Sequence, residues 1–80
     1  MSVRIVFLGP LRDLAGFAEL EVAAPLNWPN LLESVGPTVA AQLRDERIHL
    51  ACAGRVLADK TTLHAQDGDE VALLPPVSGG

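Results

Sequence analysis

The carboxyl end of the chain is the first candidate for chemistry. The apolar run Val71-Ala72-Leu73-Leu74 is followed by Pro75 and Pro76 and then by Val77-Ser78-Gly79-Gly80. The two glycines form a tip without side chains, which suits a narrow channel in another protein. At about 3.3–3.6 Å per residue, the stretch from Pro75 onward can carry the α-carboxylate of Gly80 roughly 20 Å from the domain. The sequence therefore predicts that this carboxylate is the reactive group.

Cys52 and His49 form a second candidate, a thiol nucleophile with an imidazole base. They lie within Ile48 to Ala53 (IHLACA), which alternates like a strand. Alternation places Ile48, Leu50 and Cys52 on one face and His49 on the other, so the two side chains should not meet. We expect Cys52 to be a small core residue, because free cysteine is among the most buried residue types.

A third candidate is His64 with the acidic residues Asp67, Asp69 and Glu70. Asp-Gly-Asp is ordinary turn sequence, and the spacing matches neither a calcium loop nor a zinc set. The sequence also has no phosphate-cradling glycine motif and no Gly-x-Ser-x-Gly elbow. We therefore predict a solvated turn here, no metal site, and no catalytic constellation inside the domain.

The composition predicts one small globular domain. The 80 residues are 49% hydrophobic and 20% charged, with a net charge of −4. The acidic balance argues against a nucleic-acid binder and suits a partner with a basic surface. A single cysteine excludes an intramolecular disulfide framework. Neither a signal peptide nor a transmembrane span is recognisable, so we expect a cytoplasmic protein without a membrane partner.

Alternating apolar residues predict the strands that must carry this tail. Val3 to Leu8 reads as a strand that Gly9-Pro10 stops, and Leu11 to Ala15 as one helical turn that Gly16 ends. A second strand near Phe17 to Ala23, with Phe17, Leu20 and Val22 as core candidates, completes a hairpin. The final strand, Val71 to Leu74, is apolar throughout, which suits a central position covered on both faces.

The middle of the chain predicts two short helical pieces followed by short strands. Asn27 suits the N-cap and Pro29 the first turn, while Leu26 and Leu31 fit a hydrophobic staple. Gly36-Pro37 should interrupt the helix, with a second piece from about Thr38 to Glu46. Next come Ile48 to Ala53, a tight connection at Gly54-Arg55, the pair Val56-Leu57, and Leu63 as a core anchor. This order predicts an α+β domain with a helix packed on one face of a mixed sheet.

The stretch from Asp67 to Gly80, DGDEVALLPPVSGG, closely resembles the C-terminal signature of the molybdopterin synthase small-subunit family, MoaD. Phe7 and the segment Leu11 to Gly16 resemble that family's first strand and its Arg-acidic-x-x-Gly loop. The two matches lie near the two ends of the chain. The sequence departs from the pattern at Ala53, where members more often carry Asn, and at Pro10.

The resemblance implies a ubiquitin-like β-grasp domain over residues 1–76 and a flexible Gly-Gly tail over 77–80. It implies a sulfur carrier that is not an enzyme alone: a MoeB-type enzyme adenylates Gly80 with ATP, and a sulfurtransferase replaces AMP with sulfur. The thiocarboxylate then enters the large subunit, MoaE, to sulfurate a pterin precursor, in a hetero-oligomer. No cofactor is bound, since sulfur is carried covalently at Gly80. Gly79 and Ser78 would thread the tail, while Val77, Pro76, Pro75 and Leu74 would contact the partner.

Three other interpretations stay open. A ThiS-type carrier for thiamine biosynthesis shares the fold, the Gly-Gly end and the activation chemistry, although the tail LPPVSGG favours the molybdopterin branch. A ubiquitin-like protein modifier would join Gly80 to a lysine amine. A non-catalytic binding module would carry the tail incidentally. Co-purification with a particular large protein would separate these.

Overall fold

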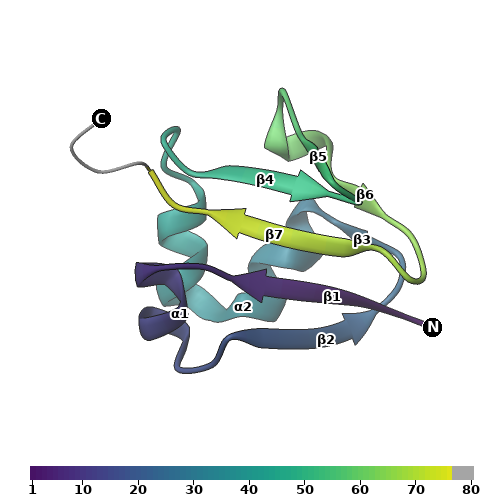
Figure 1. Ribbon diagram of the computed structural model, residues 1–80, viewed down its shortest axis with the longest axis horizontal. Helices are drawn as coiled ribbons and strands as arrows, with labels where there is room; N and C mark the ends of the chain where they lie inside the picture. The colour runs from purple at the N-terminus through teal and green to yellow at the C-terminus, as the bar shows by residue number, and fades with distance from the viewer. Residues whose placement is uncertain (77–80) are drawn as a thin grey trace.

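The computed structural model of the protein describes residues 1–76 (Figure 1). Its elements follow the order that the sequence predicts, a hairpin, a helical segment and then short strands, and end in a last apolar strand. They are β1 (Ser2–Phe7), α1 (Pro10–Ala15), β2 (Glu19–Ala23), β3 (Leu26–Asn27), α2 (Trp28–Leu43), β4 (His49–Cys52), β5 (Arg55–Val56), the 3₁₀ turn η1 (Lys60–Thr62), β6 (His64–Ala65) and β7 (Glu70–Leu74).

Five strands form one mixed sheet in the order β2-β1-β7-β4-β5. β7 is central: it pairs in parallel with β1 and antiparallel with β4. β1 and β2 form the predicted antiparallel hairpin, with Ile5 opposite Leu20. The central position expected for the last strand is therefore confirmed, but coverage of both faces is not, because Val71 and Leu73 are buried while Ala72 and Leu74 on the other face are only partly buried.

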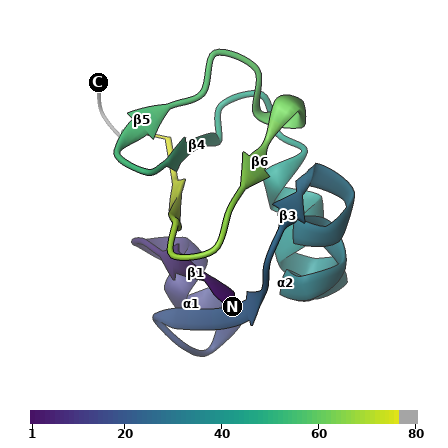
Figure 2. The same cartoon turned by 90° about the vertical axis from the view of Figure 1, so that its right-hand side faces the viewer.

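A second, two-stranded sheet pairs β3 with β6, beside the start of α2 (Figure 2). Leu26 lies opposite Ala65, and both side chains are buried. Leu63, just before β6, is 3% exposed, which confirms it as a core anchor. These short strands were not predicted, because two-residue segments show no measurable alternation.

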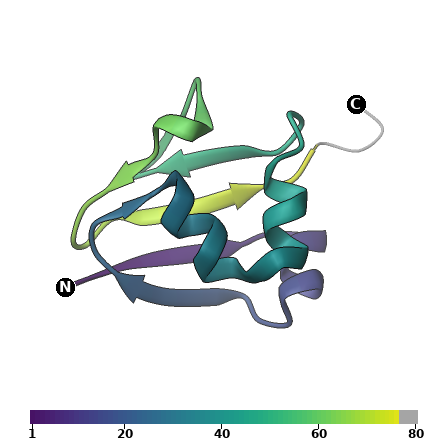
Figure 3. The same cartoon turned by 180° about the vertical axis from the view of Figure 1, so that it is seen from behind.

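Helices α1 and α2 cover one face of the main sheet (Figure 3). Alternate residues of β1, namely Val3, Ile5 and Phe7, are buried against them, as are Val71 and Leu73 of β7. Leu11, Leu31, Val39 and Leu43 supply the helical side of this core. The α+β prediction, a mixed sheet with a helix packed on one face, is confirmed.

α2 is kinked where the sequence predicts an interruption. Its N-terminus is capped by Asn27, whose Oδ1 accepts a hydrogen bond of 3.0 Å from the backbone N–H of Asn30. At Gly36 the backbone takes φ 86° and ψ 164°, a conformation outside the helical region, immediately before Pro37. The second piece ends at Leu43, earlier than the predicted Glu46. No helix in the described residues is long and apolar enough to cross a membrane.

Phe17 corrects the prediction for the first hairpin. β2 begins only at Glu19, and Phe17 is 44% exposed instead of being a core residue. Gly16 ends α1 in the left-handed conformation, so the chain turns before β2 starts and leaves Phe17 at the end of the sheet. Its ring still packs edge to face on Phe7, with centroids 5.2 Å apart. Leu20 and Val22, partly buried, do pack against the core.

Candidate functional site

β7 is the last strand of the domain, and the predicted tail follows it in the sequence. Leu73 is the last residue paired with β1, opposite Phe7, and Leu74 is still paired with His49 of β4. Pairing stops before Pro75, as predicted, because proline has no N–H to donate. Leu74 and Pro75 are half-buried and Pro76 is exposed. The predicted site residues Val77, Ser78, Gly79 and Gly80 lie outside the described residues.

One side of Pro75 is flanked by the turn that links β1 to α1. Gly9 begins this turn with φ 54° and ψ −133°. A Cβ atom placed on Gly9 would lie 3.3 Å from Cγ of Pro75. The sequence marked Gly9 only as a strand stop, since no local pattern reveals which distant residue will lie against it.

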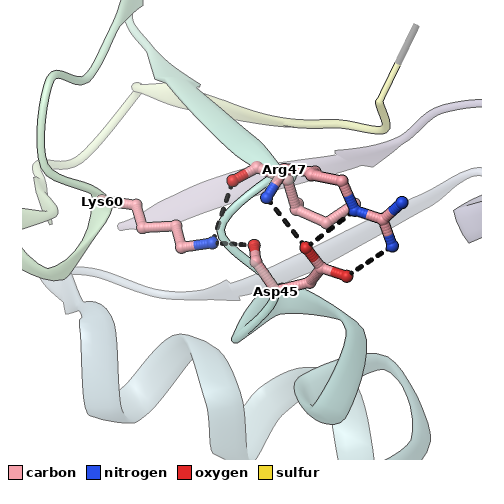
Figure 4. A network of polar contacts seen from close by, with 4 residues as sticks. Asp45, Arg47 and Lys60 are labelled. Atoms are coloured by element: carbon pink, nitrogen blue, oxygen red, sulfur yellow. Dashed lines mark hydrogen bonds and ion pairs between the residues drawn. The ribbon is translucent and has the colours of Figure 1, made fainter.

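The loop before β4, which leads into His49 opposite Leu74, is held by polar contacts (Figure 4). The Lys60 Nζ group donates hydrogen bonds to the backbone carbonyl of Asp45 and, at 2.9 Å, to that of Ile48. It also lies 6.0 Å from the centroid of the Trp28 ring. Partial burial lowers the pKa of Lys60. This network fixes the chain that enters β4 at His49, the partner of Leu74.

Asp45 also stabilises this loop, through hydrogen bonds from Arg47 to its carboxylate. Its carboxylate accepts hydrogen bonds from the Arg47 backbone N–H at 2.9 Å and from Nη2 at 2.9 Å. The side-chain hydrogen bond from Arg47 lowers the pKa of Asp45 from 3.8 to about 2, with a further contribution from the backbone N–H. The loop is therefore stabilised most when Asp45 is ionised.

No described helix covers the other face of the sheet, which is turned toward the viewer in Figure 1. On this open face, an apolar row crosses four strands: Val6 lies opposite Ala72, Ala72 opposite Ala51, and Ala51 opposite Val56. The first three are partly buried, and Val56 is exposed. Leu74 lies on the same face, two residues further along β7 than Ala72. The row therefore leads toward the start of the predicted tail.

Charged residues border this row, with Arg4 and Glu70 on the side away from the tail and Glu19 opposite Val6 at the β2 end. Arg4 Nε lies 3.5 Å from Glu19 of β2, and Arg4 Nη1 lies 3.8 Å from Glu70 of β7. All three side chains are more than half exposed, so each ion pair is worth little to stability. The open face thus combines an apolar centre with a charged rim, as protein interfaces often do.

Cys52 and His49 do not form a dyad. Cys52 packs against the core, while His49 is exposed on the open face, as the alternation predicts. Cys52 is only partly buried, and its Sγ lies 4.0 Å from Asp69 Oδ2. Burial, and secondarily the charge of Asp69, raise the pKa of the Cys52 thiol. A raised pKa disfavours the thiolate, so the site lacks the features of a nucleophilic cysteine.

The acidic residues after β6 organise a turn. Asp67 Oδ1 accepts a 2.8 Å hydrogen bond from the Ser2 backbone, and Asp69 Oδ2 accepts one of 2.8 Å from Gln66. Gly68 between them has φ 88°. Within residues 1–76, no group of three or more His, Cys, Asp or Glu side chains could hold a metal ion. These carboxylates therefore act on the backbone around them.

Comparisons with known proteins agree with this architecture. SAMP1 from Haloferax volcanii is 27% identical, with a TM-score of 0.72 and full coverage of both chains. Small archaeal modifier protein 1 from Methanosarcina acetivorans is 25% identical, with a TM-score of 0.74 over 99% of this chain and 96% of that one. The complex of subunits 1 and 2 of molybdopterin-converting factor from Helicobacter pylori matches over the full length of both chains at 24% identity and a TM-score of 0.67.

No curated protein sequence matches the chain. The likeness to these solved structures confirms the predicted ubiquitin-like β-grasp fold. The ThiS family matches residues 5–80, nearly the whole chain. The protein therefore belongs to the ThiS family of ubiquitin-like sulfur carriers.

Proposed function

We propose that the chain is the sulfur-carrying subunit of a molybdopterin synthase. Residues 1–76 hold and present the tail, residues 77–80, and Gly80 carries the sulfur. The observation that carries this proposal is the end of β7: a central strand, paired on both sides, stops at two prolines beside the open face. The tail sequence Val77-Ser78-Gly79-Gly80 follows directly.

The chemistry follows from the poor reactivity of a carboxylate toward nucleophiles. A Gly80 oxygen attacks the α-phosphate of ATP on a MoeB-type enzyme, and pyrophosphate leaves. A hydrosulfide equivalent delivered by a sulfurtransferase then attacks the acyl carbon, and AMP leaves, which gives the thiocarboxylate. The thiocarboxylate is a tethered nucleophile, so that sulfur delivery becomes a positioned step in the partner's site. In this scheme the catalytic groups belong to the partners, and no cofactor is bound here.

The open face and Leu74 support a large-subunit partner of the MoaE kind. The Helicobacter pylori neighbour is a complex of subunits 1 and 2 of the molybdopterin-converting factor, which is a precedent for such a hetero-oligomer in this fold. Pro75, Pro76 and Val77 would continue the contact from Leu74, and Ser78 and Gly79 would thread into the partner. With a net charge of −4, the chain should associate faster with a basic partner at low salt.

A protein modifier is the second candidate, because the two SAMP1 structures have the higher identities, 27% and 25% against 24%. In that case the activated Gly80 carbonyl would be attacked by a lysine amine, with AMP leaving, to form an isopeptide bond. A ThiS-type role in thiamine biosynthesis would use the same thiocarboxylate with a different acceptor. The three roles therefore differ in the molecule that accepts the sulfur or the Gly80 acyl group.

The test is to supply the thiocarboxylated chain, prepared by intein cleavage with ammonium sulfide, to each acceptor. With a MoaE large subunit and the sulfur-free pterin precursor, we expect sulfur to be transferred to the pterin and Gly80 to return to a carboxylate. A chain ending in an unmodified Gly80 is the matched control. Transfer only to thiazole-forming enzymes, or isopeptide bonds formed on adding the activating enzyme and ATP, would contradict the molybdopterin role.

A further inference from the structure

Gly9 and Pro75 lie close together across the end of the sheet. Five glycines in the described residues have positive φ angles: Gly9, Gly16, Gly36, Gly54 and Gly68. A Cβ atom would meet nothing within 4 Å at the last four, but at Gly9 it would lie 3.3 Å from the Pro75 ring. Gly9 thus differs from the other four glycines, because a side chain added at Gly9 would meet another residue.

The turn that contains Gly9 is held in place by hydrogen bonds and by a buried side chain. The backbone N–H of Leu11 donates to the Leu8 carbonyl and that of Arg12 to the Gly9 carbonyl, each at 3.1 Å. Leu11 is 2% exposed, so it anchors α1 in the core. Gly9 itself has φ 54° and ψ −133°, a backbone region that residues with a Cβ rarely adopt. A turn held in this way cannot easily yield to a side chain added at position 9.

Pro75 is the first residue after β7 and is free of the ladder, whereas Leu74 is still paired with His49. A Cβ on Gly9 would require its neighbour to give by a few tenths of an ångström. The Gly9 turn is held by its hydrogen bonds and Leu74 by the ladder, so Pro75 is the residue that would move. Any change at Pro75 alters the direction in which the following residues leave the domain.

We propose that Gly9 is a positioning residue for the carrier tail: its missing side chain lets Pro75 lie beside the β1–α1 turn and so sets the direction in which the chain leaves the sheet at Pro76. The expected effect on thiocarboxylation rests on the proposed function, whereas the proximity of Gly9 and Pro75 does not. The role is indirect, since Gly9 would touch neither the nucleotide nor the sulfur.

A double-mutant cycle tests the proposal. Gly9→Ala should lower kcat/KM for thiocarboxylation by about tenfold, since small misplacements of a reacting group are costly. In a Pro75→Ala background, which removes Cγ, the same change should cost less than about twofold, the limit for independent sites. Gly36→Ala is the matched control, because it strains a positive-φ glycine with nothing within 4 Å. It should lower the melting temperature and leave kcat/KM unchanged.

Equal losses for Gly9→Ala in both backgrounds, or an equal loss for Gly36→Ala, would overturn the positioning role. If Gly9→Ala does not fold, the proximity measurement that follows decides, because Pro75 is also a proposed partner contact and a loss of activity in Pro75→Ala alone would not isolate Gly9. A nuclear Overhauser effect between the Gly9 Hα protons and the Pro75 ring protons tests the contact without any activity. Its absence overturns the proposal, whereas its presence in a chain that is never adenylated would mean that only the proposed function has failed.

Discussion

Leu74 and His49 form the last residue pair of the β7–β4 ladder, one residue beyond the point where β7 leaves β1. The central strand is thus released from its two neighbours in sequence, first from β1 and then from β4. The Lys60 network holds the loop that leads into His49, and the Gly9 turn lies against Pro75. The domain therefore holds the chain up to Pro75, the first residue beyond the ladder.

Ala53→Asn should stabilise the protein. Ala53 has φ 52° and Gly54 has φ 85°, the two positive angles of a type I′ hairpin turn between β4 and β5. Alanine is strained there, whereas asparagine tolerates this conformation, so we expect a gain of about 0.5–1 kcal/mol. Urea unfolding measures it, with Ala58→Asn in an exposed loop as the control. A gain no larger than that of the control would contradict the turn assignment.

Lys60→Met should destabilise the fold through the loop before β4. The variant keeps much of the aliphatic chain but leaves the carbonyls of Asp45 and Ile48 without their donor. Losing hydrogen bonds to a charged group in a partly buried site should cost about 1–2 kcal/mol. Arg55→Met on the exposed strand β5 is the control and should stay within about 0.5 kcal/mol of the parent. Similar unfolding curves for both variants would show that the network adds nothing.

Acid should weaken the domain partly through Asp45. Its pKa is 3.8 in the unfolded reference and about 2 in the fold, because Arg47 donates to the ionised carboxylate. Since the folded pKa is the lower one, the stabilisation is present above pH 3.8 and is lost as the pH falls toward 2. Urea unfolding from pH 5 to about pH 2 should show a shallower pH dependence for Asp45→Asn than for the parent. Glu33→Gln removes one exposed charge as the control, and an Asp45→Asn slope equal to the control's would refute the linkage.

Most of the fold could be predicted from local patterns. Alternation in β1 and the continuous apolar run of β7 identified these two neighbouring strands, and Gly36-Pro37 identified the kink in α2. The prediction that Phe17 is a core residue was wrong. Its residue type indicates burial, but the turn at Gly16 leaves it at an end of the sheet. The β3–β6 pair was missed since its stability comes from tertiary packing of Leu26 and Ala65, which no short segment encodes.

The end of strand pairing before Pro75 could be predicted, because proline has no N–H to donate to a ladder. That Leu74 and Pro75 contact a partner stays a prediction. Gly9 and Lys60 were missed, since each acts on residues far away in sequence. The local signals, a glycine before a proline and a lysine after an aspartate, have ordinary turn explanations.

Removing Gly79 and Gly80 should separate function from stability. Neither residue adds an apolar side chain, so the free energy of unfolding should change by under ~0.5 kcal/mol while sulfur transfer is lost. Gly79→Val keeps the terminal carboxylate but restricts the backbone and widens the tip, so adenylation or transfer should fall sharply in a folded protein. Parental activity of Gly79→Val would show that a narrow path is not required, and its unfolding would contradict a tail independent of the core.

The most direct test of the sulfur-carrier role is the mass of the carboxyl terminus. The chain is incubated with a MoeB-type enzyme, ATP and a sulfur source, and intact-mass and C-terminal peptide spectra are recorded. We predict that one oxygen of Gly80 is replaced by sulfur, only when ATP is present. An unchanged Gly80 carboxylate, under conditions that convert a known carrier in a parallel reaction, would contradict the account.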